Sequence, residues 1–457
     1  MARFALTGER DGQMRSFFYN NLTSELSNAD GTPVPVTPFA RREYAPAAAP
    51  AGTSAAQPSA KVQPAVLKVQ LGLSCNYACD YCSQRFVPHA EQTGPDDVAM
   101  FVEQLVASIN LQEVRRVEFW GGEPFVYWKT LRPLADALRI RMPAAQFLII
   151  TNGSLLDAEK NAWLDELGFC VGISHDGPGQ YVRGPDPLAD PERRAAILDL
   201  YARLRPQNRV SFNAMLNRRN TSRAAIAKFF VALTGDEDVP IGEGSFIDPY
   251  DAGGLSNSLL AGEIDGFVQQ ALAELRTGEA KNFNLAAQRI AEIVDAIANR
   301  RPASALRQKC SMDREDHLAV DLHGRVLTCQ NVSAAAKAPN GKNHHIGSLD
   351  DLAGVRLDTA THFAHRPQCM ACPVLQQCKG SCMFLEGELF DAACENAWAD
   401  HLPFLAAAFE FITGFRLMKV FGPHPQRRHY VRNAQSHYQI NGTSIVQKRQ
   451  YIPIHPI

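Results

Sequence analysis

Three cysteines lie within eight residues of one another, at Cys75, Cys79 and Cys82. Their spacing is C-x3-C-x2-C, and thiolates at this spacing can wrap one face of a cubane iron–sulfur cluster. A zinc site would need a fourth cysteine or histidine close by, but the window holds none and the nearest histidine is His89. The pattern therefore predicts a cluster whose fourth iron has no protein ligand, an open position of the kind that catalytic metal sites keep.

A glycine-rich segment, Gly121-Gly122-Glu123-Pro124, follows a short apolar run that reads as a strand. Two glycines allow the backbone to approach a ligand closely. The Glu123 carboxylate is an acceptor suited to an ammonium group. On its own the segment could be a simple turn, but its place after a strand and downstream of the cysteines favours a binding role.

Two further strand ends carry polar residues, and these include Asn152, Ser174 and Asp176. In barrel enzymes the active-site groups lie at the carboxyl ends of the strands, so these segments are consistent with one shared site. The alternative for each is a turn or a helix cap.

A second group of seven cysteines lies toward the C-terminus, with C-x2-C-x5-C-x3-C at its centre. The seven are Cys310, Cys329, Cys369, Cys372, Cys378, Cys382 and Cys394. A zinc ribbon built from the four central cysteines is the alternative, but it leaves three cysteines unexplained. The whole chain has 11 cysteines, an odd and clustered set that argues against a disulfide framework.

The elements that must position these residues alternate between strand and helix from about residue 65. Apolar runs predict six strands, at 66–73, 116–120, 147–151, 169–174, 209–215 and 244–247. Helical spacing predicts five helices between them, at 98–110, 131–140, 158–167, 195–204 and 223–233, and two more at 259–276 and 286–300. Such alternation is typical of a parallel sheet. We therefore expect an α/β fold, a partial (β/α)6 TIM-type barrel followed by a small cysteine-rich iron–sulfur domain.

Together these patterns resemble the radical S-adenosylmethionine (SAM) superfamily. The cysteine loop after the first strand is similar to that family's CxxxCxxC signature, and Gly121 to Pro124 are similar to its GGE segment. The resemblance implies that Cys75, Cys79 and Cys82 hold a catalytic [4Fe–4S] cluster. It also implies that the GGE segment binds the methionine part of SAM. Tyr81 stands where the family has an aromatic residue near the adenine, with core packing as the competing interpretation.

The C-terminal cysteines, with Gly324 five residues before Cys329, resemble the SPASM extension of peptide-maturing and protein-maturing members. The resemblance implies two auxiliary [4Fe–4S] clusters, one held by Cys310, Cys329 and Cys382 and the other by Cys369, Cys372, Cys378 and Cys394. Two such clusters need eight ligands and seven cysteines are present. The first auxiliary cluster is therefore expected to have an open iron or a non-cysteine ligand such as Asp313 or His317.

The function implied is modification of a ribosomally made peptide or protein. A 5′-deoxyadenosyl radical would abstract hydrogen, and net oxidation would follow as a crosslink or an oxidised side chain. Expected partners are the precursor peptide or protein and a low-potential donor of the flavodoxin or ferredoxin type. One alternative is an anaerobic sulfatase-maturing enzyme that forms formylglycine. Another is a non-catalytic iron–sulfur scaffold or peptide-binding protein, against which the intact cysteines and Glu123 count.

Composition bounds these expectations. The chain has 457 residues, with 46% hydrophobic and 21% charged, and a formal net charge of −2. This near-neutral balance predicts no nucleic-acid partner, and we see no apolar run long enough for a membrane span. Without an export signal in the first residues, a cytoplasmic location is expected.

Domain boundaries follow from shifts in pattern. We expect residues 1–61 to be poorly ordered, with an Ala/Pro linker at 45–58, and residues 62–300 to form the barrel. Residues 301–396 would form the iron–sulfur domain. Residues 397–457 would form a helix over 397–420 and an irregular tail.

Overall fold

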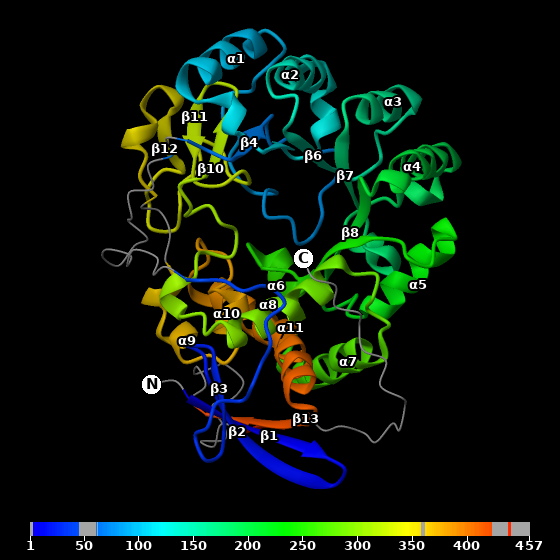
Figure 1. Ribbon diagram of the computed structural model, residues 1–457. Coiled ribbons are helices and arrows are strands. Elements are labelled where there is room, and N and C mark those ends of the chain that lie inside the picture. The colour runs from blue at the N-terminus through cyan, green and yellow to red at the C-terminus, as the bar shows by residue number, and fades with distance from the viewer. Residues whose placement is uncertain (1–2, 45–60, 62, 358–361, 423–436, 440–457) are drawn as a thin grey trace. The chain divides into compact units, whose positions relative to one another are not determined.

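The computed structural model describes residues 3–44, 61, 63–357, 362–422 and 437–439 (Figure 1). The linker expected at 45–58 and most of the expected C-terminal tail lie outside the described residues. Contacts divide the chain into two compact units. The first unit comprises residues 51–214 and 310–360, and the second comprises 1–50, 215–309 and 361–457. This division differs from the expected boundaries, because the segment 310–360 belongs with the barrel strands.

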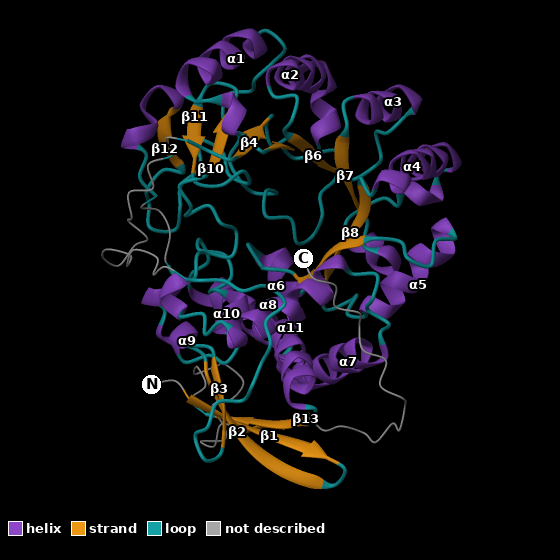
Figure 2. Ribbon diagram, in the orientation of Figure 1, coloured by secondary structure: helices purple, strands orange, loops and turns teal. Residues whose placement is uncertain are grey.

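The first unit is built on a sheet whose strands run in the order β12-β11-β10-β4-β5-β6-β7-β8. Strands β4 to β8 are mutually parallel, and Figure 2 shows helices α1 to α4 along the outer side of these strands. The strands are β4 (Val66–Gln70), β5 (Arg116–Trp120), β6 (Gln146–Thr151), β7 (Phe169–Ser174) and β8 (Val210–Leu216). The helices are α1 (Asp97–Ser108), α2 (Trp128–Arg141), α3 (Ala158–Glu166) and α4 (Pro191–Leu204). These elements match the predicted alternation to within a few residues.

The core of this unit lies between the strands and the helices. Phe119 on β5, Phe147 on β6 and Phe169 on β7 are fully buried or nearly so, and their ring centroids lie 5.4 to 5.5 Å apart. Aromatic rings at these separations combine large buried area with favourable ring contacts. The parallel backbone pairing of β4 to β7 sets their register, which brings the carboxyl ends of these strands together at one edge.

Three more strands extend this sheet beyond β4. They are β10 (His317–Asp321), which pairs with β4 in parallel, and β11 (Arg325–Leu327) and β12 (His345–Ser348), which continue it in antiparallel fashion. None of these three strands was among the strands predicted from the sequence, because strands of three to five residues leave almost no periodicity to detect.

The second unit contains β9 (Ile241–Phe246), the sixth strand predicted, and most of the remaining helices. The helices are α5 (Arg223–Thr234), α6 (Ala252–Ser256), α7 (Ile264–Thr277), α8 (Asn284–Ala298), α9 (Pro367–Met370), α10 (Leu375–Cys378) and α11 (Gly387–Thr413). Helix α11 packs along α7 and α8 and is buried over most of its length. The α/β class and the parallel barrel strands are thus confirmed.

The expectation that residues 1–61 are poorly ordered is wrong for the first part of this segment. The second unit holds an antiparallel sheet in the order β14-β13-β1-β2-β3. Its strands are β1 (Arg3–Arg10), β2 (Gln13–Asn20), β3 (Glu25–Asn28), β13 (Arg416–Phe421) and β14 (His437–Gln439). Phe17 packs edge-on against Phe409 of α11, with centroids 5.1 Å apart. The segment is ordered because its apolar side chains meet a partner 392 residues away (409 − 17), which local composition does not reveal.

The C-terminal helix also differs from its predicted bounds. It begins ten residues before residue 397, at Gly387, and ends at Thr413 rather than at residue 420. Gly414 follows in the left-handed conformation (φ 71°) that commonly ends helices, and β13 comes next. No helix in the described part of the chain combines the length and apolar character needed to span a bilayer.

Candidate active site

The predicted cluster ligands lie on the loop that follows β4. Cys75 is exposed, and Cys79 and Cys82 are half-buried. The backbone N–H of Tyr77 donates to Cys75 Sγ at 3.3 Å, and that of Gln84 donates to Cys82 Sγ at 3.4 Å. Hydrogen bonds of this kind stabilise a sulfur that carries negative charge. The loop therefore presents its sulfurs to incoming metal with backbone donors already in place.

Electrostatics ties the three thiols together. The pKa of Cys79 is raised to about 11, mainly by burial, with Arg183 opposing the rise and Cys82 and Cys75 adding to it. Burial also raises the pKa of Cys75. The Cys75 and Cys79 thiols therefore stay protonated near neutral pH, and metal must displace these protons to bind. Within the described ranges, no three His, Cys, Asp or Glu side chains converge closely enough to hold a single ion. A cubane cluster spaces its thiolates more widely than one ion does, and the donor set of this loop fits one.

The glycine-rich segment after β5 lies against the cysteine loop, backbone to backbone. The N–H of Gly122 donates to the Gly72 carbonyl at 3.1 Å, and that of Glu123 donates to the Ser74 carbonyl at 3.0 Å. A Cβ added to Gly122 would lie 2.3 Å from Ser74 O, and one added to Gly121 would lie 2.7 Å from Gly72 O. Both glycines are therefore required by this close approach. Pro124 begins the short 3-10 helix Pro124–Tyr127, where its missing N–H costs nothing.

Glu123 is buried at 1% exposure and organises two strand ends. Its Oε1 accepts from Thr151 Oγ1 at 2.7 Å and from the Phe125 N–H at 3.2 Å, and its Oε2 accepts from the Asn152 N–H at 2.7 Å. Burial raises the pKa of Glu123, and these hydrogen bonds offset only part of the rise. Three of about four acceptor positions of the carboxylate are thus filled, which leaves one for a ligand.

Asn152 reaches back to the cysteine loop. Its Nδ2 donates to Asn76 Oδ1 at 2.9 Å, Asn76 Nδ2 donates to Ser154 Oγ at 2.8 Å, and Ser154 Oγ donates to Asn152 Oδ1 at 2.6 Å. This ring of three side chains fixes the residue that follows Cys75. Sequence reasoning singled out Asn152 but missed Asn76, Ser154 and Thr151, because their roles depend on partners from other strands.

Tyr81, between two of the cysteines, is held by groups that follow β7. Its hydroxyl donates to Asp176, which is 0% exposed, and accepts from Arg183 Nη1 at 3.1 Å. Arg183 also pairs with Asp176 at 3.5 Å. Burial would lower the pKa of Arg183, but Tyr81 and Asp176 outweigh it and raise that pKa. Asp176 thus anchors the tyrosine ring, and Arg183 is a site residue that our sequence analysis did not find.

The remaining predicted residue on this edge is Ser174, the last residue of β7, which is buried and pairs in register with Asn213 of β8. Next to it, His175 Nδ1 accepts from the Gly177 N–H, so its Nε2 carries the proton that it shares with Asp186 at 3.0 Å. Both ring nitrogens of His175 therefore have hydrogen-bond partners within the protein.

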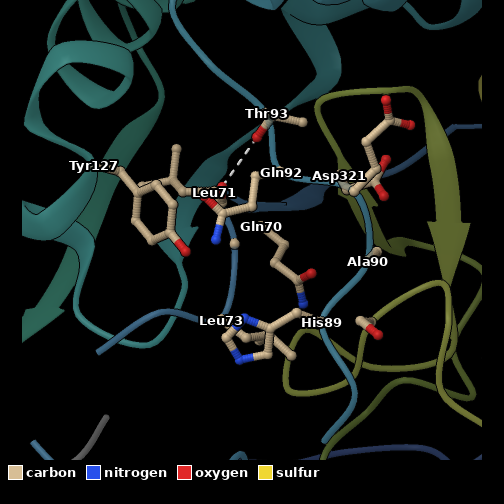
Figure 3. A pocket seen from close by; sticks show the side chains of 12 residues that line it. Gln70, Leu71, Leu73, His89, Ala90, Gln92, Thr93, Tyr127 and Asp321 are labelled. Atoms are coloured by element: carbon tan, nitrogen blue, oxygen red, sulfur yellow. Dashed lines mark hydrogen bonds between the residues drawn. The ribbon is translucent and has the colours of Figure 1, made fainter. Parts of the chain in front are cut away.

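A cavity of about 20 Å³ lies beside the start of the cysteine loop (Figure 3). Thr93 Oγ1 donates to the Leu71 carbonyl at 3.0 Å, and the Ser74 N–H donates to the Tyr127 hydroxyl at 2.7 Å. Tyr127 lies so close to Gly72 that an added Cβ would meet its hydroxyl at 2.3 Å. The cavity has room for about one water, so it reflects the packing that supports the loop.

The seven C-terminal cysteines fall in both units. Cys310 and Cys329 lie in the first unit, and the other five lie in the second. Cys329 Sγ accepts from the Asn331 N–H at 3.4 Å, and Asn331 Oδ1 accepts from Gln84 at 3.0 Å, next to the first cysteine loop.

Of the two non-cysteine ligand candidates, Asp313 is an electrostatic neighbour that raises the pKa of Cys310, after burial. His317 lies on β10 with its Nδ1 2.8 Å from Asp316 Oδ1.

The cysteines of the predicted second auxiliary cluster are mutual neighbours. Burial raises the pKa of Cys369, and Cys378, Cys394 and Cys372 raise it further. Cys369 belongs to an apolar cluster with Phe363 and Leu385, against which Cys382 and Cys394 also pack. The donor set is thus four thiols in one buried region, which fits a [4Fe–4S] cluster.

Comparison with known proteins identifies relatives of the part of the chain that holds the cysteine loop and the parallel strands. Residues 69–229 match the family model of the Radical SAM superfamily. A stretch of 175 residues is 25% identical to the radical SAM cyclopropyl synthase TigE of Paramaledivibacter caminithermalis, covering 33% of this chain and 35% of TigE. The match thus spans about a third of the length of this curated relative.

Solved structures share the fold. The structure of anSMEcpe with bound AdoMet has a TM-score of 0.56 at 16% identity, covering 77% of this chain and 98% of that chain. The same protein with AdoMet and the Cp18Cys peptide has a TM-score of 0.54 at 18% identity, over the same shares. At such identities the likeness establishes the architecture.

Proposed function

We propose that this chain, which carries a radical SAM domain at residues 69–229, modifies a ribosomally made peptide or protein by radical hydrogen abstraction. The observation that carries the proposal is the joining of the three-cysteine loop to three strand ends within one unit. The loop is bonded to the Gly122 segment, to Asn152 through Asn76, and to Asp176 through Tyr81.

The [4Fe–4S] cluster, when bound, supplies the electron that cleaves SAM into methionine and a 5′-deoxyadenosyl radical. Cys75, Cys79 and Cys82 are its proposed ligands. The bare backbone of Gly121 and Gly122 lets the methionine part approach, and Glu123 offers its remaining acceptor position to the ammonium. Asp176 and Arg183 hold the Tyr81 ring in place for the adenine.

We expect the substitution Gly122→Ala to weaken SAM binding and lower the rate of SAM cleavage about 100-fold. The added methyl would meet a backbone carbonyl 2.3 Å away, so the two loops must separate, and displacements of about 1 Å cost rates of this order. Gly94→Ala is the control, because nothing lies within 4 Å of its Cβ. Equal SAM affinity in the Gly122 variant and wild type, measured by calorimetry on the reconstituted proteins, would contradict the proposed close approach.

The affinity for SAM should fall in mild acid. Glu123 binds an ammonium only when ionised, and its pKa is raised by burial, so protonation sets in at a higher pH than for an ordinary glutamate. Dissociation constants measured from about pH 8 to about pH 5 should therefore rise toward low pH. The Glu123→Gln variant should bind SAM weakly, and its dissociation constant should change less with pH. An equal pH dependence in both proteins would show that a group other than Glu123 titrates.

The proposed substrate class is a peptide or protein, and the product a crosslink or an oxidised side chain. The structure of anSMEcpe was solved with a bound peptide, which supports a peptide substrate for this chain. The seven C-terminal cysteines support two auxiliary clusters, which would carry away the electron released by a net oxidation. A low-potential flavodoxin or ferredoxin is the proposed donor.

The test is anaerobic reconstitution followed by an iron count and an assay of 5′-deoxyadenosine under dithionite. About 12 irons per chain with deoxyadenosine formed supports three clusters in a radical SAM enzyme. Short peptides encoded beside the gene are then tested for loss of hydrogen by mass spectrometry. A count of about four irons per chain with activity would contradict the two proposed auxiliary clusters. Formation of formylglycine on a sulfatase peptide would favour the sulfatase-maturing alternative.

A further inference from the structure

Arg366 is a buried arginine in the second unit, three residues before Cys369. It is 5% exposed, and its guanidinium carbon lies 3.8 Å from the centroid of the Phe390 ring. Its Nη2 donates to the Leu385 carbonyl at 2.8 Å and to the Met383 carbonyl at 3.4 Å. The side chain is therefore fixed in one place by packing and by two backbone carbonyls.

No carboxylate forms an ion pair with Arg366 among the described residues, and its buried Nη1 has no hydrogen-bond partner there. Its charged or ionisable neighbours are Cys369, Cys382, Glu386 and Cys394. Glu386 is solvent-exposed, so its charge is screened by water. The groups that share the buried surroundings of Arg366 are the three thiols.

Burying a permanent positive charge is unfavourable unless negative charge lies nearby. Neutral thiols supply none. Metal coordination deprotonates thiols outright. The compensation for Arg366 therefore comes from thiolates that hold a cluster.

We propose that Arg366 is the counter-cation of the second auxiliary cluster and raises its reduction potential. Reduction adds one negative charge to a cluster, and a fixed cation in a low-dielectric interior stabilises that charge. Arg366 neighbours Cys369 and Cys394, which are both assigned to this cluster. The inference rests on the proposed auxiliary clusters and extends them to a residue that is not a ligand.

The chain offers a matched control in Arg139 of the first unit. That guanidinium lies 3.7 Å from the Phe147 ring centroid and donates to the Ala145 and Leu167 carbonyls at 2.7 Å each. Arg139 thus has the same kinds of contact as Arg366. Burial alone lowers the pKa of Arg139, and no thiol contributes to this shift.

The experiment uses the full chain with Cys75, Cys79 and Cys82 replaced by alanine, so that only auxiliary clusters remain. In this background Arg366→Gln keeps amide donors for the carbonyls but removes the charge, whereas Arg366→Lys keeps the charge. Midpoint potentials are read by EPR-monitored redox titration, together with iron content and circular dichroism. We expect a more negative potential in the glutamine variant, near-parental values in the lysine variant, and no shift in Arg139→Gln.

The outcomes separate this inference from the proposed function. No iron in the parent background would overturn the auxiliary clusters and this role of Arg366 together. Iron present with equal potentials in the glutamine variant and the parent would overturn the role of Arg366 alone, as would equal shifts in the glutamine and lysine variants. Iron retained by the lysine variant and lost by the glutamine variant would support it, because the two differ in charge, and loss in both would assign Arg366 to folding only.

Discussion

The variant in which Cys75, Cys79 and Cys82 are all replaced by alanine should lose about four irons per chain and all 5′-deoxyadenosine formation. These thiols are the proposed ligands of the one cluster that faces SAM, and no other cysteine lies on their loop. Iron content and deoxyadenosine are measured on anaerobically reconstituted protein. The remaining irons, about eight, should stay bound because their proposed ligands are far along the chain.

The loss should not reflect unfolding. Cys75 is exposed and Cys79 and Cys82 are half-buried, so little core packing is removed with their sulfurs. Far-ultraviolet circular dichroism of the variant should therefore match wild type. Cys170→Ala is the control, since this thiol lies on β7, outside the cysteine loop, and accepts from Gln146 Nε2 at 3.3 Å. Wild-type iron content and activity in the triple variant would overturn the leading assignment.

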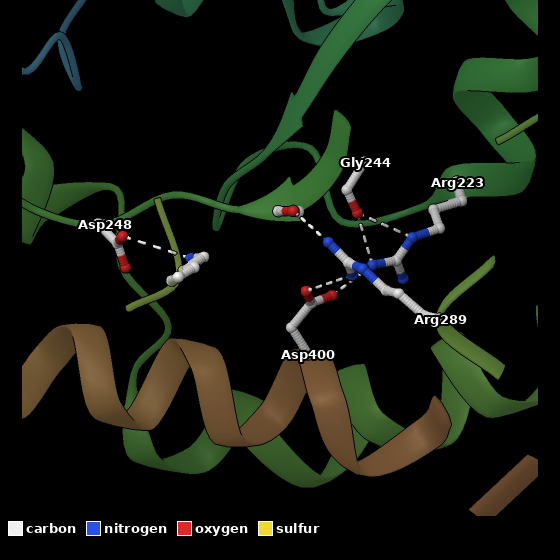
Figure 4. Close-up of polar contacts among 7 residues, drawn as sticks. Arg223, Gly244, Asp248, Arg289 and Asp400 are labelled. Atoms are coloured by element: carbon white, nitrogen blue, oxygen red, sulfur yellow. Dashed lines mark hydrogen bonds and ion pairs between the residues drawn. The ribbon is translucent and has the colours of Figure 1, made fainter. Parts of the chain in front are cut away.

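The second large effect concerns stability and follows from a buried charge network in the second unit (Figure 4). Asp400 on α11 is 2% exposed and pairs with Arg223, which is 1% exposed, and with Arg289 Nη1 at 3.1 Å. Arg223 also donates through Nε to the Gly244 carbonyl at 3.0 Å, and Arg289 donates to Ser245. One carboxylate thus balances two arginines and joins α5, α8, β9 and α11.

We expect Asp400→Asn to lower the free energy of unfolding by about 3–5 kcal/mol, because both arginines lose their counter-charge within the protein. Denaturant titrations of wild type and variant measure the change. Asp238→Asn is the control, since its pair with Lys281 at 3.1 Å is exposed and worth about 0–1 kcal/mol. Similar unfolding midpoints for Asp400→Asn and wild type would show that the network contributes little.

The same charge network predicts that the free energy of unfolding depends on pH. Burial alone would raise the pKa of Asp400, but Arg223 and Arg289 outweigh burial and hold it well below the ordinary value. A depressed pKa contributes stability above the unfolded value of about 4, and this contribution is lost as pH falls below it. The difference in the free energy of unfolding between wild type and Asp400→Asn should therefore be largest at neutral pH and small in strong acid.

Much of the barrel could be predicted from the sequence, because its signals are local. The apolar runs that became β4 to β9 and the helical spacing between them depend on residues a few positions apart. The ten cysteines assigned to the proposed clusters were singled out in the same way, since ligand spacing within a loop is set by the covalent chain. The N-terminal sheet was missed, since Phe17 is ordered by contact with Phe409 at the other end of the chain.

The sequence by itself determined which chemistry the chain is equipped for: the spacing of Cys75, Cys79 and Cys82, the paired glycines and the order of the elements. Only the tertiary structure decided that Glu123 fills three of its acceptor positions with protein donors, that Arg183 holds Tyr81, and that Arg366 lies among thiols. The reason is physical. Spacing along the chain defines groups of ligands, whereas burial and charge depend on residues brought together from distant strands and helices.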